Sequence, residues 1–408
     1  MGAPRTVGAR ELFQEPGFRR LFSARVVSLF GSAIAPTALA FAILGIPGST
    51  VRDLGLVVGA HSLARVFFLL FGGVFADRLG KVRVIIGSDL VAGLAQGGIA
   101  ALVLRGTPSL ALLTALSALS GAAAALFLPA SSGIIPEILP DVELQSANSL
   151  LRLSTNASMI VGAAAAGALV AFVGSGGALL LDALTFLVSA LVLLGLKTPP
   201  PKRRERETVI AELRQGWEEF ASRQWLWVVV LQFAIVNACF QSGFAILGPS
   251  VAKARFSGAL SWSLITAAQS AGLVLGGFFG GRLRPRHPLR AATYAALVIG
   301  LPLLTLGLLS SALVVAASAA VQGASLSVFS VLWDTTLQTH VSKEKLARVY
   351  AYDWLGSLGL VPVFQAAVGP LAATIGVPRT LVLECALIVA VGLAALCSSS
   401  VRDLERSA

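Results

Sequence analysis

Long apolar runs recur along the whole chain, and they restrict how it can fold more than any other feature. Each has roughly the 20 residues that a helix needs to cross the hydrocarbon core of a bilayer. Backbone polar groups cannot be left unpaired in lipid, so these runs are predicted to be helices. We expect twelve transmembrane helices, at residues 21–45, 54–76, 82–104, 109–130, 149–173, 176–197, 225–247, 259–281, 290–309, 311–333, 353–374 and 380–399.

The composition agrees with a multi-pass membrane protein. The chain is 56% hydrophobic and only 12% charged, which is about half the charged share of a typical soluble domain. A net charge of +11 could suggest a nucleic-acid ligand, but the basic residues lie in short loops between the apolar runs. We therefore predict an all-α protein of the cell membrane, surrounded by lipid and with no nucleic-acid partner.

The distribution of basic residues predicts the orientation. Cytoplasmic loops of membrane proteins carry an excess of Lys and Arg. With the N-terminus inside, most of the 31 Lys and Arg residues fall on the cytoplasmic side. The outer loops then hold only Arg52, Arg105, Lys253, Arg255 and Arg379. Both termini are therefore predicted to be cytoplasmic.

A hydrophilic linker at residues 198–224 separates two sets of six helices. It begins with TPPPKRRERE, and the apolar spacing of the following ETVIAELRQGWEEFA predicts an amphipathic helix on the membrane surface. We expect a cytoplasmic arm at residues 1–20 and a cytoplasmic tail at residues 400–408. The two six-helix bundles are expected at residues 21–197 and 225–399, one on each side of the linker.

The two halves look like diverged copies of each other. GGFFGGRLRPR, from Gly276, echoes GGVFADRLGKV, from Gly72. LVLECALIVAVGL also echoes LLLDALTFLVSAL, which places Glu384 over Asp182. We interpret both acids as structural groups near the outer ends of their helices.

A tight charged turn joins the second and third apolar runs. It has the pattern Gly73-x-x-x-Asp77-Arg78-x-Gly80-Lys81-x-Arg83, within GGVFADRLGKVRV at residues 72–84. Gly80 is expected to supply the positive φ of the turn. The preceding glycines are expected to pack closely against a neighbouring helix. Without further evidence, such a turn can also be read as a plain positive loop.

This turn resembles the loop between the second and third helices of the major facilitator superfamily. Residues 128–151 and 332–358 resemble the branch of that family that includes bacterial enterobactin exporters and macrolide efflux proteins. The resemblance implies two pseudo-symmetric six-helix bundles that work by alternating access. It also implies that certain residues form a cytoplasmic gate, namely Gly73, Asp77, Arg78, Gly80, Lys81, Arg83, Asp334, Arg348 and Asp353.

Nothing in the sequence predicts an enzyme or a bound cofactor. His61, His287 and His340 lie in three separate regions, and the three cysteines have no metal-ligand spacing. The sequence also has no GxxxxGK[ST] phosphate loop. Transport is therefore expected to use an ion gradient, with a proton as the coupling ion.

Polar groups inside apolar helices are the candidates for binding substrate or protons, because they are costly in lipid. Arg65 lies near the middle of the second helix, one turn from His61, and Asp89 is the acid at useful depth in the first half. Asp89 is expected either to carry the proton, with Arg65 as its charge partner, or to fasten the third helix. Neutral amides are expected either to bind substrate or to join helices: Gln232, Asn237, Gln241, Gln269, Gln322 and Gln365.

These features together predict a monomeric secondary transporter that exports an amphipathic small molecule, such as a drug, a siderophore or a natural product. Two alternatives are kept. The chain could import small molecules or lysolipids, or it could be a non-transporting sensor or partner subunit.

Overall fold

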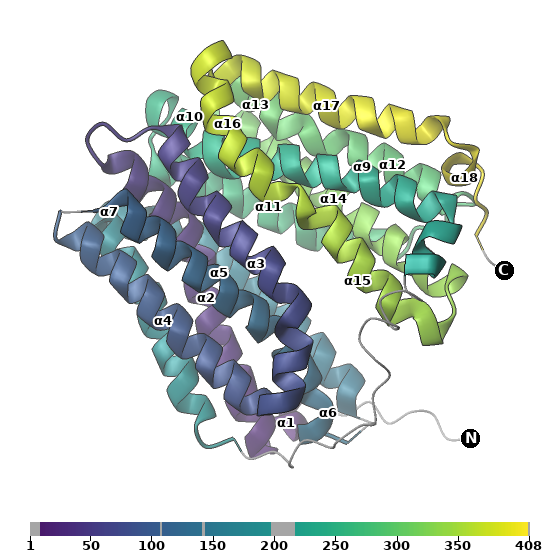
Figure 1. The fold of residues 1–408 in the computed structure, drawn as a ribbon, viewed down its shortest axis with the longest axis horizontal. Coiled ribbons are helices and arrows are strands. Elements are labelled where there is room, and N and C mark those ends of the chain that lie inside the picture. Colours follow the sequence, from purple (N-terminus) through teal and green to yellow (C-terminus); the bar gives the residue numbers. More distant parts are fainter. Residues whose placement is uncertain (1–8, 107, 141–142, 197–216, 407–408) are drawn as a thin grey trace. The chain divides into compact units, whose positions relative to one another are not determined.

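The computed structural model describes residues 9–106, 108–140, 143–196 and 217–406. Every regular element within these ranges is a helix, which confirms the predicted all-α class (Figure 1). Most of the predicted amphipathic helix in the linker lies outside the described residues, and its last residues, 217–221, are helical.

The chain forms two compact units. Met1–Ser49 and Leu56–Arg203 make the first, and Thr50–Gly55 and Arg204–Ala408 make the second. The helices of the first unit are α1 (Ala9–Leu12), α2 (Pro16–Gly45), α3 (Val51–Leu79, whose first residues belong to the second unit), α4 (Lys81–Leu104), α5 (Leu110–Gly133), α6 (Ile135–Ile138) and α7 (Leu144–Leu193).

The second unit contains the remaining helices, coloured teal to yellow in Figure 1. They are α9 (Gln224–Ser242), the π-helical turn η2 (Gly243–Leu247), α10 (Gly248–Arg255), α11 (Ala259–Gly280), α12 (Pro288–Leu297), the 3₁₀ turn η3 (Val298–Gly300), α13 (Leu301–Leu308), α14 (Ala312–His340), α15 (Lys343–Gly359), α16 (Val361–Ile375), α17 (Val377–Cys397) and α18 (Ser399–Arg402).

Ten helices of the described residues are long and apolar enough to cross a membrane. The longest candidate, Ser146–Leu193, spans 48 residues, far more than the roughly 20 that one crossing requires. It bends at Gly174, whose φ of 74° is not helical, and each part is long enough for its own crossing. The sequence predicts two helices here, at 149–173 and 176–197. The total of twelve stays a prediction.

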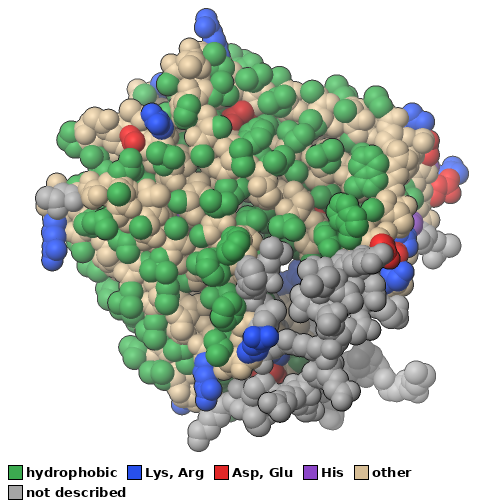
Figure 2. Space-filling view, viewed as in Figure 1, with side chains coloured by type: hydrophobic (Ala, Val, Ile, Leu, Met, Phe, Trp, Pro, Cys, Tyr) green, Lys and Arg blue, Asp and Glu red, His purple; other side chains and the backbone are tan. Residues whose placement is uncertain are grey.

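Large apolar side chains cover much of the surface, as lipid contact requires. Among the described residues, Phe172 is 88% exposed and Leu313 is 72% exposed. Apolar side chains are spread over the face shown in Figure 2. In a soluble protein such patches would mark binding sites or aggregation, whereas here they fit a protein surrounded by hydrocarbon.

One end of the first unit is closed by a small hydrophobic core. Phe18 of α2, Ile85 of α4 and Leu193 of α7 all belong to it, together with Ile134 beside α5. These residues flank the predicted N-terminal arm, the charged turn, and the ends of the fourth and sixth predicted helices. The core therefore places the predicted cytoplasmic segments of this unit at one end.

Helices α11 and α14 pack through small residues in the second unit. A Cβ at Gly276 would lie 2.5 Å from the Cα of Ala324, and one at Gly272 would lie 2.7 Å from the carbonyl carbon of Ala320. Side chains larger than hydrogen would hold the two backbones apart. Gly276 opens the second copy of the charged-turn pattern, so this copy has the close packing that the sequence predicts for its counterpart, Gly72.

Candidate functional site

The charged turn of the first unit is tied to the loop after α5. Gly80 has a φ of 88°, as the sequence predicts. Lys81 Nζ donates hydrogen bonds of 2.6 Å to the carbonyl oxygen of Gly133 and to Glu137 Oε1. The turn is thus fastened within its own unit by a lysine that interacts with the start of α6.

The other residues of this turn are exposed or lie outside the described side chains. Arg78 and Arg83 are exposed. The structure does not describe the side chain of Asp77 or the surroundings of Gly73. Their proposed gate roles therefore rest on the sequence pattern.

In the second unit, the predicted gate residue Asp353 is buried. Its carboxylate accepts hydrogen bonds from Trp333 Nε1 at 3.1 Å and from Ser357 Oγ at 3.2 Å. Asp334 is exposed and accepts a 3.3 Å hydrogen bond from Tyr350 Oη. The side chain of Arg348 lies outside the described residues. Asp353 therefore joins α15 to α14 instead of lying in a solvated loop.

A group of charged residues that the sequence analysis did not single out lies at the same end of the second unit. Glu219 accepts hydrogen bonds from Lys345 Nζ at 2.8 Å and from Arg223 Nη2 at 2.7 Å. The bond from Lys345, aided by Arg223, holds the pKa of Glu219 below its ordinary value, although burial acts in the opposite direction. Arg223 also donates to the carbonyl oxygen of His340. This group ties the end of the linker to α14 and α15.

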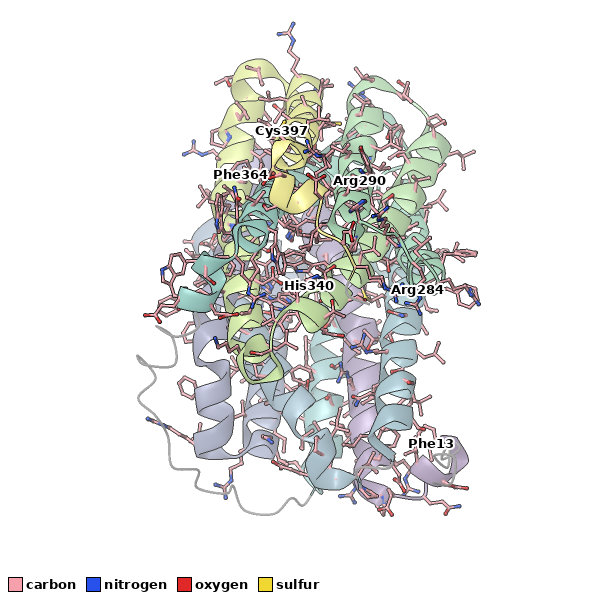
Figure 3. All side chains as sticks on the ribbon, turned by 90° about the vertical axis from the view of Figure 1, so that its right-hand side faces the viewer. Phe13, Arg284, Arg290, His340, Phe364 and Cys397 are labelled. Carbon is pink, nitrogen blue, oxygen red and sulfur yellow. The ribbon has the colours of Figure 1, made fainter. Side chains whose placement is uncertain are left out.

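The C-terminal tail joins the same end. Arg286 Nη2 and Glu405 Oε1 are 2.9 Å apart, and a His340 ring nitrogen lies 3.3 Å from the carbonyl oxygen of Glu405. Figure 3 shows His340 together with Arg284 and Arg290 on this side of the unit. Four segments predicted to be cytoplasmic therefore meet, namely the linker, the α11–α12 loop, the α14–α15 loop and the tail. That this end faces the cytoplasm stays a prediction.

Asp89 packs inside the first unit, against α7. It is 1% exposed, and its Oδ2 accepts a 2.6 Å hydrogen bond from Ser189 Oγ. Its Oδ1 has no hydrogen-bond partner among the described residues. Asp89 makes no ion pair with Arg65, whose side chain is exposed. Of the two roles kept open for Asp89, this geometry supports the fastening of the third helix.

His61 of α3 is partly buried and packs against α5. One of its ring nitrogens, Nδ1, is 3.1 Å from the carbonyl oxygen of Ser117. A Cβ at Gly121 would also meet the backbone of His61, 3.1 Å from its Cα. His61 therefore marks a close α3–α5 contact.

Two further buried acids occupy corresponding positions in the two units. Asp182 of α7 accepts a 2.6 Å hydrogen bond from Gln96 Nε2, and Glu384 of α17 accepts a 2.5 Å hydrogen bond from Ser242 Oγ. They are 1% and 4% exposed. In each carboxyl group the second oxygen has no hydrogen-bond partner among the described residues. Both acids lie between helices, so their role is not confined to ending a helix.

Three of the six candidate amides join helices of the second unit. Gln269 Nε2 donates to Gln322 Oε1 at 2.9 Å, which links α11 to α14. Asn237 Nδ2 donates to the carbonyl oxygen of Ser357 at 3.1 Å, which links α9 to α15. For these three residues the structure favours the joining of helices over contact with a substrate. Gln232 and Gln365 are 3% and 2% exposed, and the described residues offer no hydrogen-bond partner to either polar atom of Gln232 or to Oε1 of Gln365.

Gln241 differs from the other amides. It is only partly buried, and the described residues supply no hydrogen-bond partner for its side chain. With Arg65, it stays a candidate for substrate contact.

A comparison with models of known families decides the class of this protein. The model of the Major Facilitator Superfamily matches residues 21–361. The chain belongs to the major facilitator superfamily. It is therefore a multi-pass membrane transport protein and not an enzyme.

Curated relatives of this facilitator protein are distant and include exporters. It is 26% identical over 343 residues to the enterobactin exporter EntS of Escherichia coli. This alignment covers 82% of this chain and 80% of EntS. It is 25% identical over 284 residues to the uncharacterized MFS-type transporter YkuC of Bacillus subtilis. That alignment covers 66% of this chain and only 65% of YkuC.

Solved structures share the facilitator fold. The nucleoside transporter NupG superposes with a TM-score of 0.76 at 12% identity, over 93% of this chain and 98% of NupG. A bacterial homologue of the human lysosomal transporter Spinster gives a TM-score of 0.74 at 15% identity, over 98% and 100% of the two chains. Identities this low establish the fold alone.

The Lys81–Glu137 contact allows a first test of what stabilises the charged turn. Lys81→Met should lower the apparent Tm in detergent more than Glu137→Gln, because it also removes the bond to the Gly133 carbonyl. The ion pair is partly exposed, at 24% and 31%, so its own coupling energy should be about 0.2–1 kcal/mol. A double-mutant cycle on thermal unfolding measures it. Equal Tm values for the wild type and both variants would show that the turn needs only its glycine.

Proposed function

We propose that this facilitator protein exports an amphipathic small molecule, such as a drug, a siderophore or a natural product, in exchange for protons. It acts in the cell membrane with both termini in the cytoplasm. The observation that carries the proposal is the alignment with an enterobactin exporter over 82% of this chain. Membership of a transport family also argues against a non-transporting sensor or partner subunit.

The energy source follows from what the chain contains. Its sequence has no phosphate loop for ATP. Secondary transporters couple transport to an ion through a group that binds it differently in the two access states. Buried carboxyl groups within the helices, at Asp89, Asp182 and Glu384, are groups of the type that can bind and release a proton.

Reconstitution into liposomes tests the proposal. The purified full chain is reconstituted and supplied with a panel of probes: an ethidium-type dye, a macrolide and a catecholate siderophore. An exchanger that expels substrate against protons should accumulate at least one probe when the lumen is acidic relative to the bath. The gain over protein-free liposomes should be several-fold, and nigericin with potassium, which removes the pH gradient, should abolish it.

The reversed gradient separates export from import. A proton-coupled importer would accumulate the probe when the bath is acidic and the lumen is alkaline. Including a lysolipid in the panel tests the lysolipid alternative. Accumulation that requires an acidic bath would contradict export by proton exchange. Probe uptake that is the same with an acidic lumen, an acidic bath and no pH gradient would contradict proton coupling.

A further inference from the structure

Glu384 is packed into an apolar part of the second unit, against the first helix of that unit. One oxygen, Oε1, lies 2.5 Å from Ser242 Oγ, and the single hydrogen of this hydroxyl has a second acceptor in the carbonyl oxygen of Ala238, at 2.6 Å. The other oxygen, Oε2, lies directly against Gly243, where a Cβ would collide with it. Gly243 therefore leaves the space that this carboxyl group occupies.

The helix under Glu384 is irregular at this point. Gly243 begins the π-helical turn η2, between α9 and α10. A π-turn inside an α-helix carries an extra residue, and such turns occur frequently at functional sites. Because the carboxyl group rests on the first residue of this turn, its charge can influence whether the turn is kept.

No cation on the neighbouring elements balances this acid. The helices α9, α13 and α16 and the turns η2 and η3 pack against α17 and carry no Asp, Glu, Lys, Arg or His. On these elements, the titratable group beside the acid is the buried thiol of Cys239. Helix α17 itself adds the thiols of Cys385 and Cys397 and one cation, the exposed Arg379, which lies five residues before Glu384 and therefore on another face of the helix.

Charged groups of the remaining neighbours of α17 lie far along the helices. Helix α12 carries Arg290 and the exposed Tyr294, and α18 carries Arg402. Gly300, which follows α12, lies at the same height along the helices as Glu384. A Cβ at Gly300 would lie 3.0 Å from Sγ of Cys385, the residue after Glu384. Arg290 is ten residues before Gly300, or about 15 Å along a helix. An ionised Glu384 would thus be an unpaired charge in a buried, apolar site, which is strongly unfavourable.

Asp182 of the first unit is the natural comparison. Its Oδ1 lies 2.7 Å from the position of a Cβ at Gly31 in α2, just as Glu384 lies against Gly243. Asp182, however, is held by the amide of Gln96 from a third helix, and Gly31 lies in an uninterrupted α-helix. The same acid-on-glycine contact therefore occurs twice, but only Glu384 rests on a π-turn.

We propose that Glu384 is a proton-binding site, and that its protonation stabilises the π-turn at Gly243 while its ionisation destabilises that turn. This inference rests on the proposed function, because it supplies the group through which proton exchange would act. When Glu384 is neutral, Ser242 and Gly243 hold it in its buried, apolar site. When it releases its proton, the unpaired charge favours a rearrangement of η2 that admits water or a cation.

Infrared spectroscopy tests the proton site without any substrate. The full chain in lipid nanodiscs is titrated with pH, and the C=O absorption of protonated carboxyl groups is followed. The wild type should lose part of this absorption as the pH rises. Other carboxyl groups also contribute to this change, so the test is the difference between proteins. Glu384→Gln, which keeps an acceptor for Ser242, should lack one component of the wild-type change, and Asp182→Asn should keep that component. A Glu384→Gln titration identical to that of the wild type, or the same component missing from both variants, would overturn the assignment.

Transport measurements connect the site to coupling. Glu384→Gln should lose at least ten-fold of the probe accumulation driven by an acidic lumen, while probe exchange without a gradient stays within two-fold of the wild type. The retained exchange also shows that the variant is folded. Loss of both activities, or retention of gradient-driven accumulation, would contradict the inference. If the wild type itself ignores the gradient while its infrared change depends on Glu384, the proposed proton coupling fails and the proton site stands.

Discussion

Replacing Gly276 by Ala is expected to destabilise the second unit by about 3 kcal/mol, at the upper end of the usual range for overpacked positions. The added methyl group would lie 2.5 Å from the Cα of Ala324 on α14. The obstacle is backbone, which cannot turn aside as a flexible side chain can. Helices α11 and α14 would therefore have to separate along their whole contact. In lipid, close packing of this kind is a main source of helix association.

Gly281→Ala is the matched control. It adds the same methyl group five residues further along, where the nearest neighbouring atom is the Gly277 carbonyl oxygen at 3.6 Å. The measurements are the apparent Tm in detergent and the fraction of protein that elutes as a single species. Gly276→Ala should lower both clearly, and Gly281→Ala should leave them near the wild type. Similar values for the two variants would show that the α11–α14 contact tolerates a wider spacing.

The parts of this structure that follow from local chemistry could be predicted from the sequence. Apolar runs of membrane length predicted the helices, because unpaired backbone groups are excluded from lipid. The pattern around Gly80 predicted a turn with positive φ, because glycine alone adopts that conformation without strain. The glycines before that turn are predicted to pack closely against a neighbouring helix, and Gly276, the counterpart of Gly72, is packed in this way. The predictions of the helices and of the turn depend only on residues close together in the chain.

The partners of the buried polar groups could not be predicted in this way. Asp89 and the serine that binds it are 100 residues apart in the sequence, and Glu384 and Ser242 are 142 apart. Serine is common in apolar helices, so neither donor stands out. Arg65 is a more conspicuous partner for Asp89 on charge alone, yet the packing of α4 on α7 turns Asp89 towards Ser189. Packing between helices, and not charge, selects these contacts.

The amides show the same limit. The sequence leaves Gln269 and Gln322 equally suited to bind substrate or to join helices. Their mutual hydrogen bond exists because α11 and α14 approach closely at small residues, including Gly323, where a Cβ would lie 2.9 Å from the backbone nitrogen of Leu273. The glycine pattern was visible in the sequence, but the register between the two helices was not. That register determines which polar groups form hydrogen bonds with each other inside the unit.

Removing the Asp353 carboxylate should lower stability by about 1–3 kcal/mol, the cost of leaving a buried donor without its acceptor. Asp353→Ala leaves the indole N–H of Trp333 and the hydroxyl of Ser357 without the oxygens that they now reach at 3.1 Å and 3.2 Å. Asp353→Asn keeps an acceptor oxygen and should cost less. Thermal unfolding in detergent should rank the proteins in the order wild type, Asn variant, Ala variant.

Combining Asp353→Ala with Trp333→Phe isolates the shared hydrogen bond. Phe removes the indole N–H, so the double variant should be more stable than the sum of the two single losses implies, by about 1 kcal/mol. Strict additivity would show that the bond contributes nothing. Transport by Asp353→Asn then tests the gate role, because this variant changes the charge and keeps the contact. A normal Tm with strongly reduced gradient-driven accumulation supports a gate role for Asp353. Accumulation equal to that of the wild type would show that Asp353 only links α14 to α15.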